Sequence, residues 1–333
     1  MTIREYRAWR KAGVRGLCLC VWLSGACDSE NNPITTVDAA DAAGDADTAE
    51  ALDHLSFTSV WGAAADDIWA VGSGGAIVHY DGDHWQRFER LTERDLTSVH
   101  GHSADDVWAV GTDIALHWDG SSWSVKLQDI SETLLGVWQT GPDDVWMVGL
   151  AWISDSGLIR HWNGETWSGT ELRGVSSVWE VWNSPENKLW FGGSAVGGTG
   201  FLGHGQDKQF SRASYQGGSL RGIWGVSSDD VWVAPYEGSM QHWDGSSWSE
   251  HNLGVNSARM LSVSGSSTND VWAVGLHGLI EHWDGDQWNQ VDAHTDATLW
   301  SVWAPAADDA WAVGGTIMHW EGDSWQRVDD IKH

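Results

Sequence analysis

The sequence predicts an all-β fold, a seven-bladed β-propeller with four antiparallel strands per blade, preceded by a signal peptide and a disordered tether. Two observations support this prediction. A tryptophan-centred motif returns seven times at a period near 40 residues. Short runs rich in Val, Trp, Ile and Leu alternate with Gly, Asp, Ser and Asn turns, which excludes a helical solenoid. A four-stranded unit at this period is typical of a propeller blade.

Residues 1–26 have the features of an export signal. Five basic residues precede the apolar run GLCLCVWLSGA, which is too short to span a bilayer. The run ends in LSGAC, Leu23 to Cys27, which resembles the lipobox of bacterial lipoproteins. This resemblance implies cleavage before Cys27 and a diacylglycerol on its thiol; an ordinary secretion signal is the alternative. The other two cysteines, Cys18 and Cys20, lie in the leader, so the exported body would have no disulfide.

Residues 27–54 are predicted to be the lipidated Cys27 and an acidic, disordered linker. The segment after the cysteine contains eight acidic residues and no Lys or Arg. It has almost no large apolar side chain, so it cannot bury enough surface to offset the entropy of ordering. The linker would tether a single propeller domain, residues 55–333, to the membrane.

The seven copies follow from the motif DVWAVG and its variants. Their central tryptophans are Trp69, Trp108, Trp146, Trp190, Trp232, Trp272 and Trp311. The copies are predicted to span residues 55–95, 96–133, 134–174, 175–219, 220–259, 260–298 and 299–328. In each copy, four strands are expected; in the second copy they are LTSVHG, DVWAVG, IALHW and SSWSVKL.

The tryptophans are interpreted as core residues rather than as a ligand site. Of the 28 Trp, 23 fall on four repeated positions, one in each strand of the copies. The position in strand 1 lies eight residues before the DVWAVG tryptophan in every copy. Because each buried aromatic side chain removes roughly 150–250 Å² from water, packing alone accounts for them. How the ring closes stays open at this stage.

The repeat DVWAVG…HWDGSSW resembles the kelch and galactose-oxidase propeller repeat, and it is also similar to Trp-rich tectonin-type propellers. The resemblance covers all seven copies, residues 55–328. It implies a propeller fold and leaves function open, because propellers host many functions. Galactose-oxidase chemistry needs a cysteine cross-linked to a tyrosine, and the exported body has no such cysteine.

Histidines and acids also repeat, and both are interpreted as structural. One histidine per copy lies in strand 3; seven equivalent positions on a wide circle cannot converge on one metal ion, so no metal site is predicted. Each histidine is instead expected to tie strand 3 to a neighbouring turn. Paired acids in the strand 1–2 turn and Asp in the strand 3–4 turn should form an acidic face, where Asx side chains cap the turns. No cofactor is expected; calcium is the one ion left open, although no DxDxDG loop is present.

A ligand site on a repeat scaffold should appear where the repeat varies. The strand 2–3 interval is longest in copies 3 and 4, and three tryptophans of the exported body lie off the repeated positions: Trp152, Trp179 and Trp300. The predicted ligand-binding residues, over blades 3 to 5, are Trp152, Asp155, Trp179, Arg221 and Tyr236. Exposed aromatic and Arg side chains are common in binding surfaces. The alternative is that these loops are solvated and have merely drifted.

The favoured function is a lipid-anchored, extracytoplasmic, non-enzymatic binding, scaffold or adhesion module whose partner is an envelope or extracellular protein. A glycan-binding lectin of tectonin-like type is the alternative, and a glycoside hydrolase or lyase is the second. No catalytic residue is predicted, because the acids are too many to single out a glycosidase pair and no nucleophile elbow is present. The net charge of −29 excludes nucleic acid. A monomer is expected, held at the outer membrane or cell surface rather than the inner membrane.

Overall fold

The computed structural model describes residues 55–328 apart from 207–208, 214, 216 and 254–257. The predicted leader, Cys27 and the acidic linker lie outside the described residues. In the described part, no helix is long and apolar enough to cross a membrane. Its only helical segments are two three-residue 3₁₀ turns, Ser73–Gly75 and Leu276–Gly278.

Five sheets have four antiparallel strands each, in chain order. The first contains β1 (Phe57–Ala64), β2 (Asp67–Gly72), β3 (Ile77–Tyr80) and β4 (Trp85–Arg87). Copy 4 forms β11 (Val175–Asn183), β12 (Leu189–Ala195), β13 (Gly200–Gln206) and β14 (Gln209–Arg212). Copy 5 forms β15 (Leu220–Ser227), β16 (Asp230–Pro235), β17 (Met240–Trp243) and β18 (Trp248–His251). Copies 6 and 7 form β19 (Met260–Ser267), β20 (Asp270–Gly275), β21 (Ile280–Trp283), β22 (Trp288–Val291), β23 (Leu299–Ala306), β24 (Asp309–Gly314), β25 (Ile317–Trp320) and β26 (Trp325–Arg327).

The prediction of seven separate blades is wrong, because the described residues form six sheets. Copies 2 and 3 share one six-stranded sheet of β5 (Leu96–Ser103), β6 (Asp106–Trp118), β7 (Trp123–Gly141), β8 (Asp144–Ala151), β9 (Ser156–Trp162) and β10 (Trp167–Leu172). β7 contains both the last strand of copy 2 and the first strand of copy 3, and its backbone bends between them at Asp129 and Ser131, whose φ values are 55° and 58°. β6 covers the second and third strands of copy 2; it folds back at Asp113, whose φ is 64°.

Strand register explains why the aromatic positions repeat. The strand-1 position lies directly opposite the strand-2 tryptophan, as in Trp61 and Trp69, and that tryptophan lies opposite the strand-3 histidine, His79. In strands 3 and 4 the two aromatic positions also pair, as Trp118 does with Trp123. Directly opposite side chains interact most strongly in antiparallel sheets. The aromatic residues that recur at constant spacing in the sequence are therefore cross-strand neighbours in the sheet.

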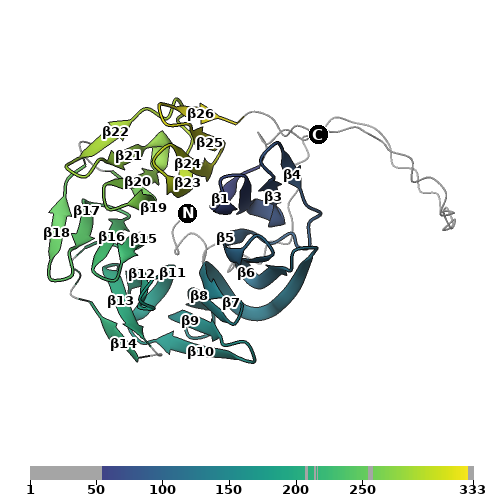
Figure 1. The fold of residues 1–333 in the computed structure, drawn as a ribbon. Helices are drawn as coiled ribbons and strands as arrows, with labels where there is room; N and C mark the ends of the chain where they lie inside the picture. Colours follow the sequence, from purple (N-terminus) through teal and green to yellow (C-terminus); the bar gives the residue numbers. More distant parts are fainter. Residues whose placement is uncertain (1–54, 207–208, 214, 216, 254–257, 329–333) are drawn as a thin grey trace, which may run out of the picture. The chain divides into compact units, whose positions relative to one another are not determined.

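The sheets surround a centre, with the first strand of each copy innermost and the last strand at the rim (Figure 1). Successive first strands contact one another, and β23 contacts β1 to close the ring. Each sheet is built from consecutive strands, so within the described residues no strand of one end joins the sheet of the other end. A buried apolar cluster that includes Trp85 of the first sheet and Trp311 of the last closes the ring. The Trp303 ring, which packs on Gly62, and a 3.3 Å hydrogen bond from the Val60 N–H to Ser301 Oγ also contribute to closure.

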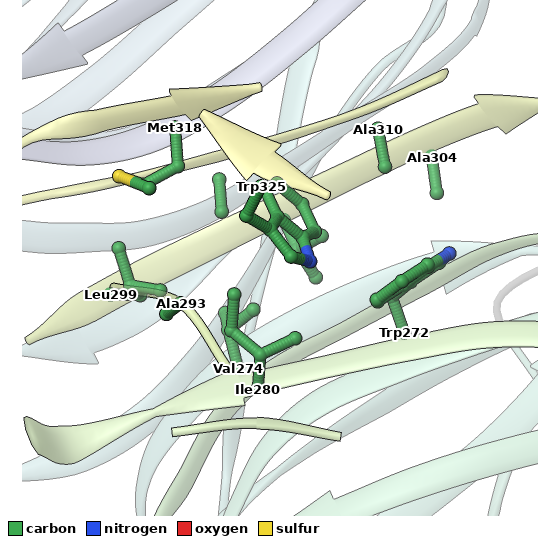
Figure 2. Close-up of a cluster of buried hydrophobic side chains, with 11 residues drawn as sticks. Trp272, Val274, Ile280, Ala293, Leu299, Ala304, Ala310, Met318 and Trp325 are labelled. Atoms are coloured by element: carbon green, nitrogen blue, oxygen red, sulfur yellow. The ribbon is translucent and has the colours of Figure 1, made fainter. Parts of the chain in front are cut away.

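Between neighbouring sheets lie clusters of buried apolar side chains. The cluster in Figure 2 joins Trp272 of β20 to Trp325 of β26, both 1% exposed or less, with Leu299 and Met318 beside them. The two indoles meet edge to face, with ring centroids 5.3 Å apart. All seven DVWAVG tryptophans are buried, which confirms the prediction that they are core residues.

Candidate functional site

The repeated histidines hold each sheet together at one edge. In six copies the strand-3 histidine Nε2 lies 2.6–2.8 Å from an Asp Oδ1 at the start of strand 2, as in His282 with Asp270. The imidazole also stacks on the strand-2 tryptophan; the His282 and Trp272 centroids are 4.0 Å apart. The structural interpretation of these histidines is confirmed in those copies. Copy 4 has Lys188 in place of the acid, and burial together with that charge lowers the pKa of His204.

The repeated acids of the strand 3–4 turn cap that turn. In copy 2 Asp119 Oδ1 accepts hydrogen bonds from the backbone N–H groups of Ser121 and Ser122 at 3.0 and 2.9 Å. The side chain and backbone of Ser121 and the backbone of Ser122 lower the pKa of Asp119 to about 2. Asp81, Asn163, Asp244 and Asp284 cap the equivalent turns. Within the described ranges, no group of three or more His, Cys, Asp or Glu could hold a metal ion.

A cavity of about 310 Å³ opens in the middle of the ring, and we call it the channel. Its walls come from the first strands of the copies and include the indoles of Trp61, Trp138, Trp224 and Trp303. Of the residues that line it, only His100 and Glu180 are ionisable. Burial lowers the pKa of His100 to about 3, so this imidazole is neutral at physiological pH.

A belt of serines joins neighbouring copies around the channel. The serine two residues before the strand-1 position accepts a hydrogen bond from the backbone N–H of the next copy, at 3.1–3.3 Å. These serines are Ser59, Ser98, Ser262 and Ser301. Copies 3, 4 and 5 carry Gly136, Glu180 and Gly222 at this position. Gly or Glu therefore replaces the serine of the belt in the three copies in which the sequence predicts a ligand site.

Glu180 accepts one hydrogen bond that a serine of the belt would otherwise accept. Its Oε1 accepts from the N–H of Val181 at 3.1 Å, the group that a serine at Gly136 would otherwise serve. Burial raises the pKa of Glu180 to about 8. Its side chain is nevertheless partly accessible, because it lines the channel.

Three of the five predicted site residues meet in one stack. The Arg221 guanidinium lies 3.6 Å from the centre of the Trp179 ring and 5.2 Å from that of Tyr236. Trp179 and Arg221 occupy the same repeat position on adjacent strands, β11 and β15, and Tyr236 follows β16 beside them. Burial lowers the pKa of Arg221 to about 10, and its Nε is buried without a hydrogen-bond partner among the described residues. Arg259 extends the stack, 5.5 Å from the Tyr236 ring.

Trp152 and Asp155 lie elsewhere, on the turn between β8 and β9. Trp152 is fixed to β7, where its Nε1 donates to Thr133 Oγ1 at 2.9 Å. The long strand 2–3 intervals are longer hairpins rather than drifted loops: β8 pairs with β9 up to Ala151 and Ser156. The equivalent hairpin of copy 4 turns at residues 196–199. Exposed aliphatic side chains occupy the two turns, Ile153 at 92% and Val196 at 68%.

Sequence reasoning missed two residues of this region, Glu180 and Arg259. An alignment of the copies would have identified Glu180, since it is the one acid at a position that is otherwise occupied by Ser or Gly. Arg259 directly precedes the first strand of copy 6, and only the fold brings it to Tyr236.

No protein-family model matches the chain, and no curated protein does. Solved structures share its fold. YCF48 from Cyanidioschyzon merolae has a TM-score of 0.64 and 16% identity over 81% of this chain and 97% of that one. A YCF48 bound to D1 peptide has a TM-score of 0.62 and 19% identity, covering 83% and 94%. Virginiamycin B lyase from Staphylococcus aureus, solved with quinupristin, has a TM-score of 0.66 and 12% identity, covering 84% and 96%. At these identities the likeness shows a β-propeller and nothing more specific.

Proposed function

We propose that the chain is an exported, lipid-anchored binding propeller that holds a segment of a partner protein. The partner would lie across the stack of Trp179, Arg221 and Tyr236 and against the turns at Ile153 and Val196. Export and lipidation at Cys27 rest on the leader sequence alone.

The stack is the observation that carries this proposal. A guanidinium packed against Trp179 at 3.6 Å and near Tyr236 at 5.2 Å is preorganised, so little side-chain entropy is lost when a ligand binds. The Arg221 side chain is half-buried, and the accessible part of its guanidinium can donate hydrogen bonds to a carboxylate or carbonyl oxygen. Tyr, Trp and Arg are also the residues that most often dominate protein interfaces.

The stack favours a protein over a glycan as the ligand. Sugar rings usually bind by lying flat on an open indole, but Arg221 covers one face of Trp179 at 3.6 Å. Exposed Ile153 and Val196 add apolar surface of the kind that protein interfaces bury. A solved propeller of similar fold, YCF48, is bound to D1 peptide, which is consistent with this choice.

The test compares the exported chain with a Trp179→Ala/Tyr236→Ala variant on a glycan array and in capture from envelope extracts. Trp300→Ala is the matched control, because Trp300 occupies the same repeat position in copy 7 and is 39% exposed. We expect a protein that is captured by the wild type and by Trp300→Ala but lost with the double variant. Capture that survives the double variant, or glycan binding that it abolishes, would contradict the proposal. Lipidation is tested separately by labelling with an alkyne fatty acid, which Cys27→Ser should abolish.

A further inference from the structure

Among the described residues, one carboxyl side chain, that of Glu180, lines the channel, in a wall made mainly of Ser, Val and Trp side chains. No Lys, Arg or Asp lines it, and His100 has its Nδ1 committed as the acceptor of the Gln139 N–H at 3.1 Å. Because Glu180 Oε1 already accepts from Val181, the second oxygen, Oε2, has no hydrogen-bond donor in the described part of the chain. The site therefore offers the free Oε2 of Glu180 to a ligand in the channel. Because burial raises the pKa of Glu180 to about 8, the carboxyl carries its negative charge in alkaline solution or when a cation binds beside it.

The charge and shape of the channel select the ligand. A lone carboxylate in a medium of low dielectric attracts a cation strongly, and indole rings favour cations as well. The net charge of −29 attracts cationic segments from a distance. A volume of about 310 Å³ is sufficient for one extended side chain and its charged group.

An ammonium fits this acceptor better than a guanidinium. A guanidinium fork is best matched by two unobstructed carboxylate oxygens, and the Val181 N–H already occupies one side of Glu180 Oε1. An ammonium is a compact charge on a slender stem with three rotatable donors. One of these donors would bind Glu180 Oε2.

We propose that the channel is a subsite for one lysine side chain of the partner, whose ammonium binds Glu180. The inference rests on the proposed function, since the same bound segment would lie over the stack and insert this side chain into the channel. The two can fail separately, because they use different residues: Glu180 in the channel, and Trp179 and Tyr236 in the stack.

The experiment measures binding of Nα-acetyl-lysine methylamide to the wild-type chain by saturation-transfer NMR at pH 8.5 and low salt. The norleucine analogue, which has the same stem without the charge, is the matched probe. Glu237→Gln is the matched protein control, since Glu237 is an exposed acid that pairs with Arg259 at 3.3 Å outside the channel.

We expect the lysine compound to bind at least tenfold more tightly than the norleucine compound. Glu180→Gln should remove that difference, whereas Glu237→Gln and Trp179→Ala/Tyr236→Ala should retain it. Equal affinity for the two compounds, unchanged binding by Glu180→Gln, or no binding by the wild type would overturn the inference. If Trp179→Ala/Tyr236→Ala loses partner capture but still binds the lysine compound, the stack contributes to partner binding and not to the lysine subsite.

Discussion

Replacement of Glu180 by Gln should stabilise the propeller in alkaline solution. Burial raises the pKa of Glu180 to about 8 from 4.5, so the folded chain holds this proton more tightly than the unfolded chain does. The stability that this adds is complete below about pH 4.5 and is lost as the pH rises through about 8. The Gln side chain has the same shape and no charge, so it escapes that loss.

The size of the effect follows from the shift. A difference of about 3.5 pKa units corresponds to ~5 kcal/mol at most, at 1.36 kcal/mol per unit. Since the carboxyl is partly accessible from the channel, solvent screening should reduce this to ~2 kcal/mol. Relative to the wild type, Glu180→Gln should therefore gain ~2 kcal/mol between pH 5 and pH 9.

Urea denaturation of both chains at the two pH values measures this difference. The comparison between variant and wild type cancels the titration of every other group. Glu89→Gln is the control, because Glu89 is exposed and should leave the difference unchanged. A gap between Glu180→Gln and wild type that stays constant from pH 5 to pH 9 would refute the placement of Glu180 in a desolvated channel.

Two further predictions concern the scaffold. His282→Ala should lower the free energy of unfolding by ~2–3 kcal/mol, because it leaves the buried Asp270 carboxylate without its 2.6 Å partner. His204→Ala, in the copy with Lys188 in place of the acid, should cost about half as much, and equal losses in urea denaturation would show that the His–Asp bond is unimportant. Gly62→Ala should cost ~1–3 kcal/mol, because its Cβ would lie 2.5 Å from the Trp303 ring and 2.9 Å from the Asp67 carbonyl oxygen at the point of ring closure. Gly141→Ala, where a Cβ would meet nothing within 4 Å, is the thermal-denaturation control; the same drop in Tm for both would contradict closure through Trp303.

The sequence predicts the strands well because side-chain register is periodic. Each repeated aromatic residue has a fixed cross-strand neighbour. The spacing of Trp61, Trp69 and His79 therefore predicts how β1, β2 and β3 pair. The sharing of one sheet by copies 2 and 3 was not predictable. It depends on whether hydrogen bonding continues along β7, and the step of 38 residues between Trp108 and Trp146 is ordinary for the repeat.

The candidate site was predicted in part. Trp179, Arg221 and Tyr236 depart from the repeat, and the fold brings them together because adjacent copies place equivalent positions side by side. Trp152 departs from the repeat as well, yet its indole N–H donates to Thr133. An aromatic residue outside the repeat can thus stabilise its own hairpin rather than belong to a ligand site. Glu180 can be recognised as a candidate binding residue only once the fold shows that the first strands enclose a channel.

The most direct test of the binding function is site-specific photocrosslinking of the anchored chain in cells. Benzoylphenylalanine would replace Ile153 or Val196 on the hairpin turns and, as a control, Asp119 in a turn at the other end of the strands. The account predicts one protein adduct from positions 153 and 196 that disappears when Trp179→Ala and Tyr236→Ala are added, and none from position 119. Adducts that form equally from all three positions, or that persist without the stack, would contradict it.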